Sequence, residues 1–204
     1  MFPLGSVLFP HALLPLHVFE ARYRALTEAC LAGDGEFGVV LIERGSEVGG
    51  GDTRFTVGTV AKILEAGRLP DGRFVLAAVG TRRLEVRRWL SEEPYPRAEI
   101  DLLDDAARDE PDAHATGARR AEVERLLRRV HALRSELGET ASSADVTLHE
   151  ETARASFEAA ALAPLGPLDA QRVLELDPPS ARFEALAGLL SEEARFLELR
   201  LASS

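Results

Sequence analysis

The pattern of apolar residues changes about halfway along this chain, and that change constrains the fold more than any other feature. Residues 1–104 contain most of the 16 glycines and consist of short apolar runs separated by turns, a pattern typical of strands. Residues 118–204 instead repeat apolar residues at helical spacing. The interval 105–117 is polar and acidic, which predicts a linker or an exposed loop. The sequence therefore predicts an α+β protein in which strands precede helices.

Several strands and one helix are expected in the first part. The helix begins at Phe19, continues through Cys30 at helical spacing and ends at Gly33. The turn Leu69–Gly72 contains Pro-Asp-Gly, in which proline fixes φ and glycine accepts a positive φ, so a hairpin should form around it. So many strands with one helix between them favour a small barrel or a strongly bent sheet. The expected strands are Ser6–Phe9, Leu13–Val18, Phe37–Ile42, Thr56–Ala66, Arg73–Thr81, Leu84–Leu90 and Ala98–Leu103.

Four amphipathic helices are expected in the second part, which predicts a bundle. The first has an apolar face from Val123 to Leu137 and ends at Gly138. Ser142 and Asp145 resemble a capping pair that would start the second helix. The remaining helices are predicted at about Asp145–Leu162, at Asp169–Leu176 and from Ser180 onward, the last with Phe183, Leu186, Leu190, Ala194, Leu197 and Leu201 on its inner face.

Composition excludes several classes of protein. The 204 residues carry a net charge of −10, which argues against a nucleic-acid backbone as the main partner. The acidity is uneven, with a net charge of −3 in residues 1–104 and −7 in residues 105–204. The single cysteine, Cys30, excludes a disulfide framework and fits a reducing compartment. No apolar run is long enough for a membrane helix, and the N-terminus lacks the basic region of a signal peptide. A cytoplasmic location with no membrane partner is expected.

The sequence shows no combination of motifs that supports catalysis. Residues 33–38 match G-x-G-x-x-G, but they follow a predicted helix and open a strand, so a helix end with a turn is the favoured interpretation. The loop Gly45–Gly51 has no Walker A lysine, and it could be a hairpin tip or a binding loop. The five histidines are scattered without metal-ligand spacing, and no G-x-S-x-G motif occurs. No catalytic residue, metal site or cofactor is therefore predicted.

Two arginine pairs surround one predicted strand: Arg82 with Arg83, and Arg87 with Arg88. Strand alternation would place one arginine of each pair on each face of the sheet. These arginines could contact an acidic peptide or a phosphate. A solvated face that pairs with the many acidic residues is the favoured alternative.

The N-terminal segment is unusually apolar and rich in proline. Met1-Phe2, Phe9 and Leu13–Leu16 supply most of this character, and most of them are expected in the core. Any part that is exposed would mark a protein-binding patch.

The order of these segments resembles the Lon N-terminal domain, also called the Lon substrate-binding domain. The densest match is Phe2-Pro3-Leu4, Val7-Leu8-Phe9-Pro10, Leu14-Pro15-Leu16 and Phe19-Glu20-Ala21-Arg22-Tyr23. Further matches lie at Phe37-Gly38-Val39-Val40, Gly58-Thr59-Val60-Ala61-Lys62-Ile63, Gly80–Val86 and Tyr95–Ile100, and looser ones at Pro167-Leu168, Gln171–Glu175 and Arg182–Leu186. No single motif is decisive, but their order and spacing together are fairly specific to this family.

The resemblance implies a PUA-like β-barrel at 1–104, an acidic linker or loop at 105–117 and a helical bundle at 118–204. In Lon proteases this region captures unfolded or degron-bearing substrates for an AAA+ motor and a Ser–Lys peptidase. This chain ends at Ser204 without a Walker A loop or a peptidase segment, and its only lysine, Lys62, lies in a predicted strand. The peptidase activity is therefore not carried over, and a stand-alone bacterial protein is expected.

The resulting functional hypothesis is a non-enzymatic module that binds proteins or unfolded peptides, or that acts as an adaptor. RNA binding through the PUA-like barrel is the alternative, and an unrecognised hydrolase or small-molecule binder has no motif to support it. Structural roles are expected for the matched motif residues Glu20, Arg22, Tyr23, Gly58, Gly80 and Arg83, with Gly58 and Gly80 allowing either close backbone approach or a bend. The predicted partner-binding residues are Phe9, Pro10, His11, Gly49, Gly50, Arg82 and Arg87.

Overall fold

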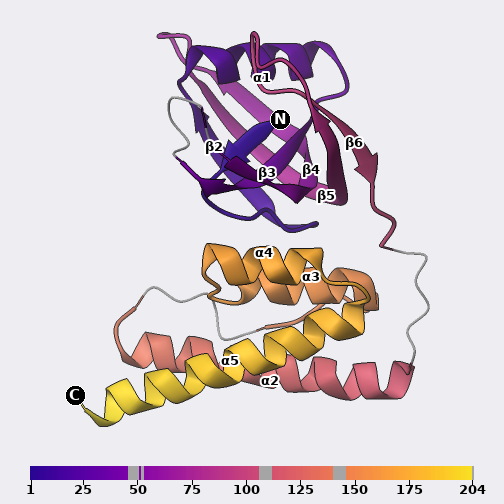
Figure 1. Cartoon of the computed structure of the whole chain (residues 1–204). Coiled ribbons are helices and arrows are strands. Elements are labelled where there is room, and N and C mark those ends of the chain that lie inside the picture. The colour runs from indigo at the N-terminus through magenta and orange to yellow at the C-terminus, as the bar shows by residue number, and fades with distance from the viewer. Residues whose placement is uncertain (46–50, 52, 106–111, 140–145, 204) are drawn as a thin grey trace. The chain divides into compact units, whose positions relative to one another are not determined.

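A computed structural model describes residues 1–45, 51, 53–105, 112–139 and 146–203. The chain divides into two compact units, Met1–Asp105 and Ala106–Ser204, and each is described by itself. The first unit contains six strands and helix α1 (Ala21–Ala32), and the second contains the other four helices (Figure 1). The predicted α+β class, with strands before helices, is confirmed.

The six strands form one sheet that curls into a half-barrel (Figure 1). Its main path runs in the order β1-β3-β4-β5-β2, and β6 pairs with β5. The long strand β5 pairs with β4 along most of its length, with β2 through its first part and with β6 through its last part. The strands are β1 (Phe2–Leu4), β2 (Leu13–Val18), β3 (Glu36–Arg44), β4 (Thr53–Arg68), β5 (Phe74–Trp89) and β6 (Ala98–Leu102).

Two strand predictions were wrong. Ser6–Phe9 is not a strand; the N-terminal strand is Phe2–Leu4, which pairs in parallel with β3. This strand was missed because it contains Pro3, and proline usually argues against a strand. A proline is nevertheless tolerated in an edge strand, where its missing N–H need not be paired. Leu84–Leu90 is not a separate strand either, because β5 continues through Thr81. A β-bulge at Thr81 lets β5 stay paired across this point, since the consecutive residues Val60 and Ala61 of β4 pair with Arg82 and Gly80.

Close backbone approach at the two motif glycines is confirmed, and it holds the curled sheet together. A Cβ atom at Gly58 would overlap the carbonyl oxygen of Val39 on β3, and one at Gly80 would overlap the carbonyl oxygen of Phe9. The hydroxyl of the buried Thr59 donates to the Leu8 carbonyl at 2.5 Å, which fixes the same N-terminal segment. The main core of this unit contains Phe2, Leu4, Leu8, Val18, Tyr23, Leu26, Cys30, Phe37, Val39, Ala61, Phe74, Leu76 and Ala78.

The second unit contains α2 (Ala113–Glu136), α3 (Thr152–Leu162), α4 (Pro167–Glu175) and α5 (Pro179–Ala202), and α2 packs against α5. The predicted inner face of α5 is confirmed. Its members Phe183, Leu186, Leu190, Ala194 and Leu197 are buried, and Leu201 near the end of the helix is half-buried. The predicted linker, residues 105–117, is too long at its C-terminal end, because residues 113–117 form the first turns of α2. The Asp112 carboxylate starts this helix by accepting from the backbone N–H groups of His114 and Ala115. The rest of the predicted linker lies largely outside the described residues.

Helix α3 begins at Thr152 rather than near Asp145, so the predicted start was wrong. The preceding residues 146–149 are not helical, and Val146 and Leu148 are buried. Arginines of α2 hold this segment: Arg128 donates to the Val146 carbonyl at 2.7 Å, and Arg120 donates to the carbonyls of Leu148 and Glu150. A backbone whose carbonyls bond to another helix does not need its own helical hydrogen bonds. The predicted capping pair Ser142 and Asp145 lies outside the described residues.

Candidate functional site

The residues predicted to bind a partner near the N-terminus do not form an exposed surface together. The side chains of Phe9 and Pro10 are buried, whereas the prediction required a surface. His11 is exposed and has a left-handed backbone with φ of 67°. Its backbone N–H donates to the Gly80 carbonyl at 2.8 Å, which joins the turn before β2 to β5, and the Ala12 N–H closes that turn by donating to the Phe9 carbonyl at 3.2 Å. Gly49 and Gly50 lie outside the described residues, so their role stays a prediction.

The arginine pairs on β5 are paired with carboxylates, as the favoured alternative predicted. Arg82 lies 3.5 Å from Glu36, and Arg87 lies 2.5 Å from Asp101 on β6. Arg88 lies 2.6 Å from Glu99. Alternation holds for the first pair, since Arg82 is exposed and Arg83 is buried.

Alternation fails for the second arginine pair, because both Arg87 and Arg88 are exposed. The register shift between Val86 and Arg88 explains the failure, since a β-bulge adds one residue on the outer side of the strand. A role of Arg82 and Arg87 in partner binding therefore stays a proposal, and any such partner would have to compete with their carboxylates.

The charged motif residues form structural pairs. Glu20 and Arg22 pair with each other at 3.1 Å at the start of α1, and the guanidinium of Arg22 lies over the ring of Tyr23. Tyr23 in turn stacks on Phe2 with ring centroids 4.2 Å apart. Arg83 is 1% exposed and binds Asp105 at 2.5 Å, at the end of the first unit. These contacts anchor α1 and the end of the sheet unit.

An exposed apolar surface of the sheet lies on its outer side, across β2, β5 and β4. Strand register places Leu13 opposite Val79, and Pro15 opposite Ala77. Leu13 is 73% exposed and Val75 is 49% exposed. We call Leu13, Pro15, Leu64, Val75 and Ala77 the outer apolar face.

A β-bulge in β4 adds Leu64 to this face. The register shift falls between Ile63, which packs toward the core, and Glu65, which pairs with Ala77. The bulged residue Leu64 therefore lies on the outer side and is 56% exposed. Glu65 and His17 supply polar groups at the margin of the face, which gives it an apolar centre with a polar rim.

An apolar hollow adjoins the outer apolar face at the free edge of β2. Pro15 and His17 border it, together with Phe19 and Glu20. Its inner wall consists of core residues of β1 and α1, including Phe2, Leu4 and Tyr23. Pro15 lacks an N–H group and therefore blunts this strand edge against pairing with a further strand. The edge thus favours side-chain contacts over the addition of a backbone strand.

Sequence reasoning identified only part of this face. Leu13–Leu16 were predicted to be mostly core, and any exposed part of this segment was expected to bind protein. The alternation of Leu13, Pro15 and His17 against Leu14, Leu16 and Val18 was the signal that could have separated the two faces of the strand. Val75 and Leu64 were missed, because Val75 lies in an almost continuous apolar run and Leu64 is displaced by a bulge.

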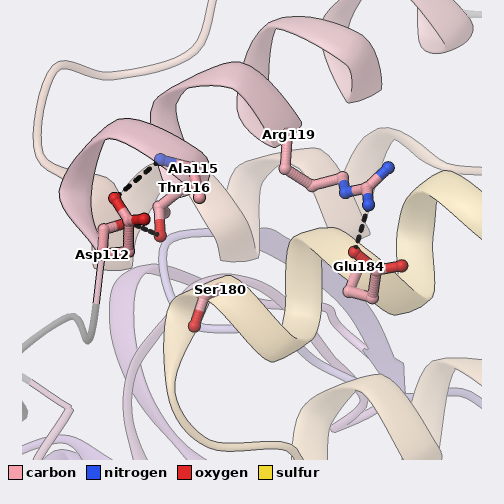
Figure 2. A pocket seen from close by; sticks show the side chains of 6 residues that line it. All are labelled: Asp112, Ala115, Thr116, Arg119, Ser180 and Glu184. Carbon is pink, nitrogen blue, oxygen red and sulfur yellow. Dashed lines mark hydrogen bonds and ion pairs between the residues drawn. The ribbon is translucent and has the colours of Figure 1, made fainter.

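The helical unit contains a hollow between the first turns of α2 and α5, and its lining includes Asp112, Thr116, Arg119, Ser180 and Glu184. Figure 2 shows Arg119 of α2 reaching Glu184 of α5, with the two groups 2.6 Å apart. Thr116 donates its hydroxyl to the Asp112 carbonyl at 2.9 Å in the same view. The Arg119–Glu184 pair joins the two helices, whereas the Thr116 hydrogen bond lies within the start of α2.

Two further kinds of feature have no candidates in the described part of the chain. Among the residues that the structure describes, no group of three or more His, Cys, Asp or Glu side chains is placed to hold a metal ion. Within the same ranges, no helix is long and apolar enough to cross a membrane.

The fold is thus a curled sheet with one helix, accompanied by a helical unit, and an apolar sheet face is the main surface feature of its described residues. The family model of the ATP-dependent protease La (LON) substrate-binding domain matches residues 1–192. The chain therefore belongs to the family of Lon substrate-binding domains.

Relatives and solved structures agree with this assignment. Lon protease 2 of Herpetosiphon aurantiacus is 30% identical over 201 residues, which cover 96% of this chain and 24% of that protein. Lon protease of Escherichia coli is 26% identical, over 98% of this chain and 25% of that protein. The chain thus spans about a quarter of the length of these relatives.

Two solved structures resemble the chain over most of its length. The crystal structure of a Lon N-terminal domain protein from Xanthomonas campestris is 28% identical, with a TM-score of 0.65, and the match covers 92% of this chain and 95% of that one. The N-terminal domain of a Mycobacterium avium complex Lon protease has a TM-score of 0.64 at 19% identity, over 93% of this chain and 96% of that one, and supports the fold alone.

Proposed function

We propose that this chain is a non-enzymatic recognition module that binds unfolded or degron-bearing polypeptides through the outer apolar face. The observation that carries the proposal is the exposure of Leu13, Leu64 and Val75 on one side of a hydrogen-bonded sheet. Exposed apolar clusters with polar rims are typical of protein-binding surfaces. Membership of a family described as substrate-binding supports the same role.

The geometry favours unfolded segments over folded partners. Unfolded chains expose apolar side chains that native proteins bury, and an open apolar face can accept them without a matching shape. Because Pro15 blunts the edge of β2, recognition depends on side chains rather than on a fixed backbone register. The module therefore selects apolar composition instead of one particular sequence.

A non-enzymatic role is proposed for this chain because the match covers the substrate-binding domain of the Lon proteins. An adaptor role, in which the module delivers bound proteins to a separate protease, fits the same surface. The single cysteine, Cys30, is a buried free thiol, which supports a cytoplasmic setting for this activity.

The test is a comparison of two forms of one protein. Labelled α-lactalbumin, either native or reduced and alkylated, is titrated with this chain, and binding is followed by fluorescence anisotropy. The reduced and alkylated form should bind at least tenfold more tightly than the native form. Equal affinity for both forms, or no saturable binding of either, would contradict the proposal.

RNA binding has weaker support than polypeptide binding. The arginines on β5 that would contact phosphates already pair with carboxylates of β3 and β6, so phosphate binding would first have to break those pairs. The acidic charge of the chain opposes the same interaction.

A further inference from the structure

We infer that the helical unit carries a second binding surface, a groove along α5 that accepts a basic segment with large apolar side chains. The groove lies between α5 and the turn that joins α3 to α4. Its apolar lining is Pro164, Leu165, Gly166, Leu189, Leu190 and Phe196, and its acidic lining is Asp169, Glu192 and Glu193. This surface is distinct from the outer apolar face, and its residues all belong to the second unit.

The outward side of α5 is amphipathic in its own right. Phe196 is 56% exposed, although the residues of the inner face of the same helix are buried. Leu189, Glu192, Glu193 and Phe196 recur at intervals of three and four residues, which aligns them along one side of the helix. A helix face that contacts only solvent is usually polar, so a large exposed aromatic side chain beside two carboxylates indicates a binding surface.

Charge specifies the partner of the groove. Asp169 is paired with Arg172 at 3.1 Å, but no cation in the described ranges lies within ion-pair distance of Glu192 or Glu193. Arg200 lies near Phe196, at 5.7 Å from the ring centroid, but its guanidinium pairs with Glu139 at 2.7 Å. The groove therefore presents the exposed ring of Phe196 beside two carboxylates that have no ion-pair partner among the described residues, and lysine or arginine would complement these charges.

The same charges disfavour a second copy of this chain as the partner. Residues 105–204 carry a net charge of −7, so two helical units would repel each other at this surface. The favoured occupant is a segment of another protein in which apolar side chains alternate with lysines or arginines. An amphipathic helix laid into the groove meets this description.

The test uses the full chain and two labelled peptides, about 16 residues long, of leucine with either lysine or glutamate, spaced so that leucine covers one side of a helix. The lysine peptide should bind more tightly than the glutamate peptide, whose leucines can contact only the outer apolar face, and this difference in affinity should be larger at about 50 than at about 500 mM NaCl. Either E192Q/E193Q or F196S should weaken binding by about threefold or more, since each exposed ion pair contributes modestly.

Two control variants test whether the loss of binding is specific to the groove. E150Q/E151Q removes the same charge from exposed residues outside the groove and should leave affinity unchanged. L13S/V75S alters the outer apolar face and should leave the difference in affinity between the lysine and glutamate peptides unchanged. Failure of the proposed function and failure of this inference, which rests on the groove alone, are therefore distinguishable. Equal binding of the lysine peptide by all variants, or equal affinity for both peptides, overturns the inference. Self-association in sedimentation velocity that F196S abolishes would assign the groove to a second copy and also overturn it.

Discussion

At the scale of single residues, the two motif glycines have a steric role. Gly58 lies where a side chain would overlap the backbone of β3, and backbone cannot move aside as a flexible side chain can. The sequence motif identified this position correctly. The structure adds the reason, which is the contact between Gly58 and the carbonyl of Val39.

Gly58→Ala should therefore destabilise the sheet unit by about 2–3 kcal/mol, because the added methyl group forces two strands apart. Urea unfolding followed by circular dichroism measures this change. Gly67→Ala is the matched control in the same strand, since its nearest contact is the Val75 carbonyl at an ordinary 3.9 Å. The control should be neutral or slightly stabilising, and equal effects of both substitutions would refute the steric role.

His131 on α2 provides a prediction of pH dependence. Burial, and then the positive charge of Arg134, lower the pKa of this histidine below its ordinary value. The unfolded chain therefore binds a proton at a pH where the folded chain does not. The free energy of unfolding should fall as the pH decreases below about 6.5.

His131→Leu should flatten this dependence between about pH 5 and 7, because leucine fills the buried site without titrating. Unfolding midpoints measured at each pH give the slope. His114→Gln, which alters an exposed histidine of the same helix, should leave the slope unchanged. If His131→Leu retains the full slope, another group is responsible for it.

At the scale of whole elements, the sequence predicted most helices and strands but misplaced those that depend on distant contacts. The hairpin at Leu69–Gly72 and the inner face of α5 follow from local signals, namely a turn sequence and helical periodicity. The start of α3 and the full length of β5 do not follow from local signals. They depend on arginines of α2 and on register shifts between strands, which no local pattern encodes.

The outer apolar face illustrates the same limit. Its β2 residues alternate along the sequence and could be predicted as one side of a strand. Val75 and Leu64 join it only through strand pairing and a β-bulge, so the complete face could not be derived from the sequence. The acidic groove on α5 was missed for a similar reason, because the turn that forms its other wall is distant in the sequence from Phe196.

The segment before α3 should depend on the arginines that hold it. Arg120→Ala should destabilise the helical unit by about 1–2 kcal/mol, because it leaves the carbonyls of Leu148 and Glu150 without their charged donor. Hydrogen exchange of residues 146–151 should accelerate at the same time. Arg125→Ala is the matched control on α2, since Arg125 is exposed and has no partner among the described residues. Unchanged exchange in Arg120→Ala would contradict this role.

At the scale of the whole molecule, the two parts of the chain differ in charge, while each exposes apolar side chains. Residues 1–104, with a net charge of −3, present an apolar face with a polar rim, and residues 105–204, with a net charge of −7, include an acidic groove. A module of this kind can recognise apolar composition with one unit and positive charge with the other. The central claim concerns the sheet unit, since that is where unfolded segments are proposed to bind.

The most direct test of that claim is the affinity of L13S/V75S for reduced and alkylated α-lactalbumin, measured by fluorescence anisotropy beside the unmodified chain. Removing two exposed apolar side chains from the outer apolar face should weaken binding by about tenfold or more. The matched control L31S/L102S removes two exposed leucines of the same unit, on α1 and β6, and should bind as the unmodified chain does. Undiminished binding by L13S/V75S, or an equal loss in the control, would contradict the claim.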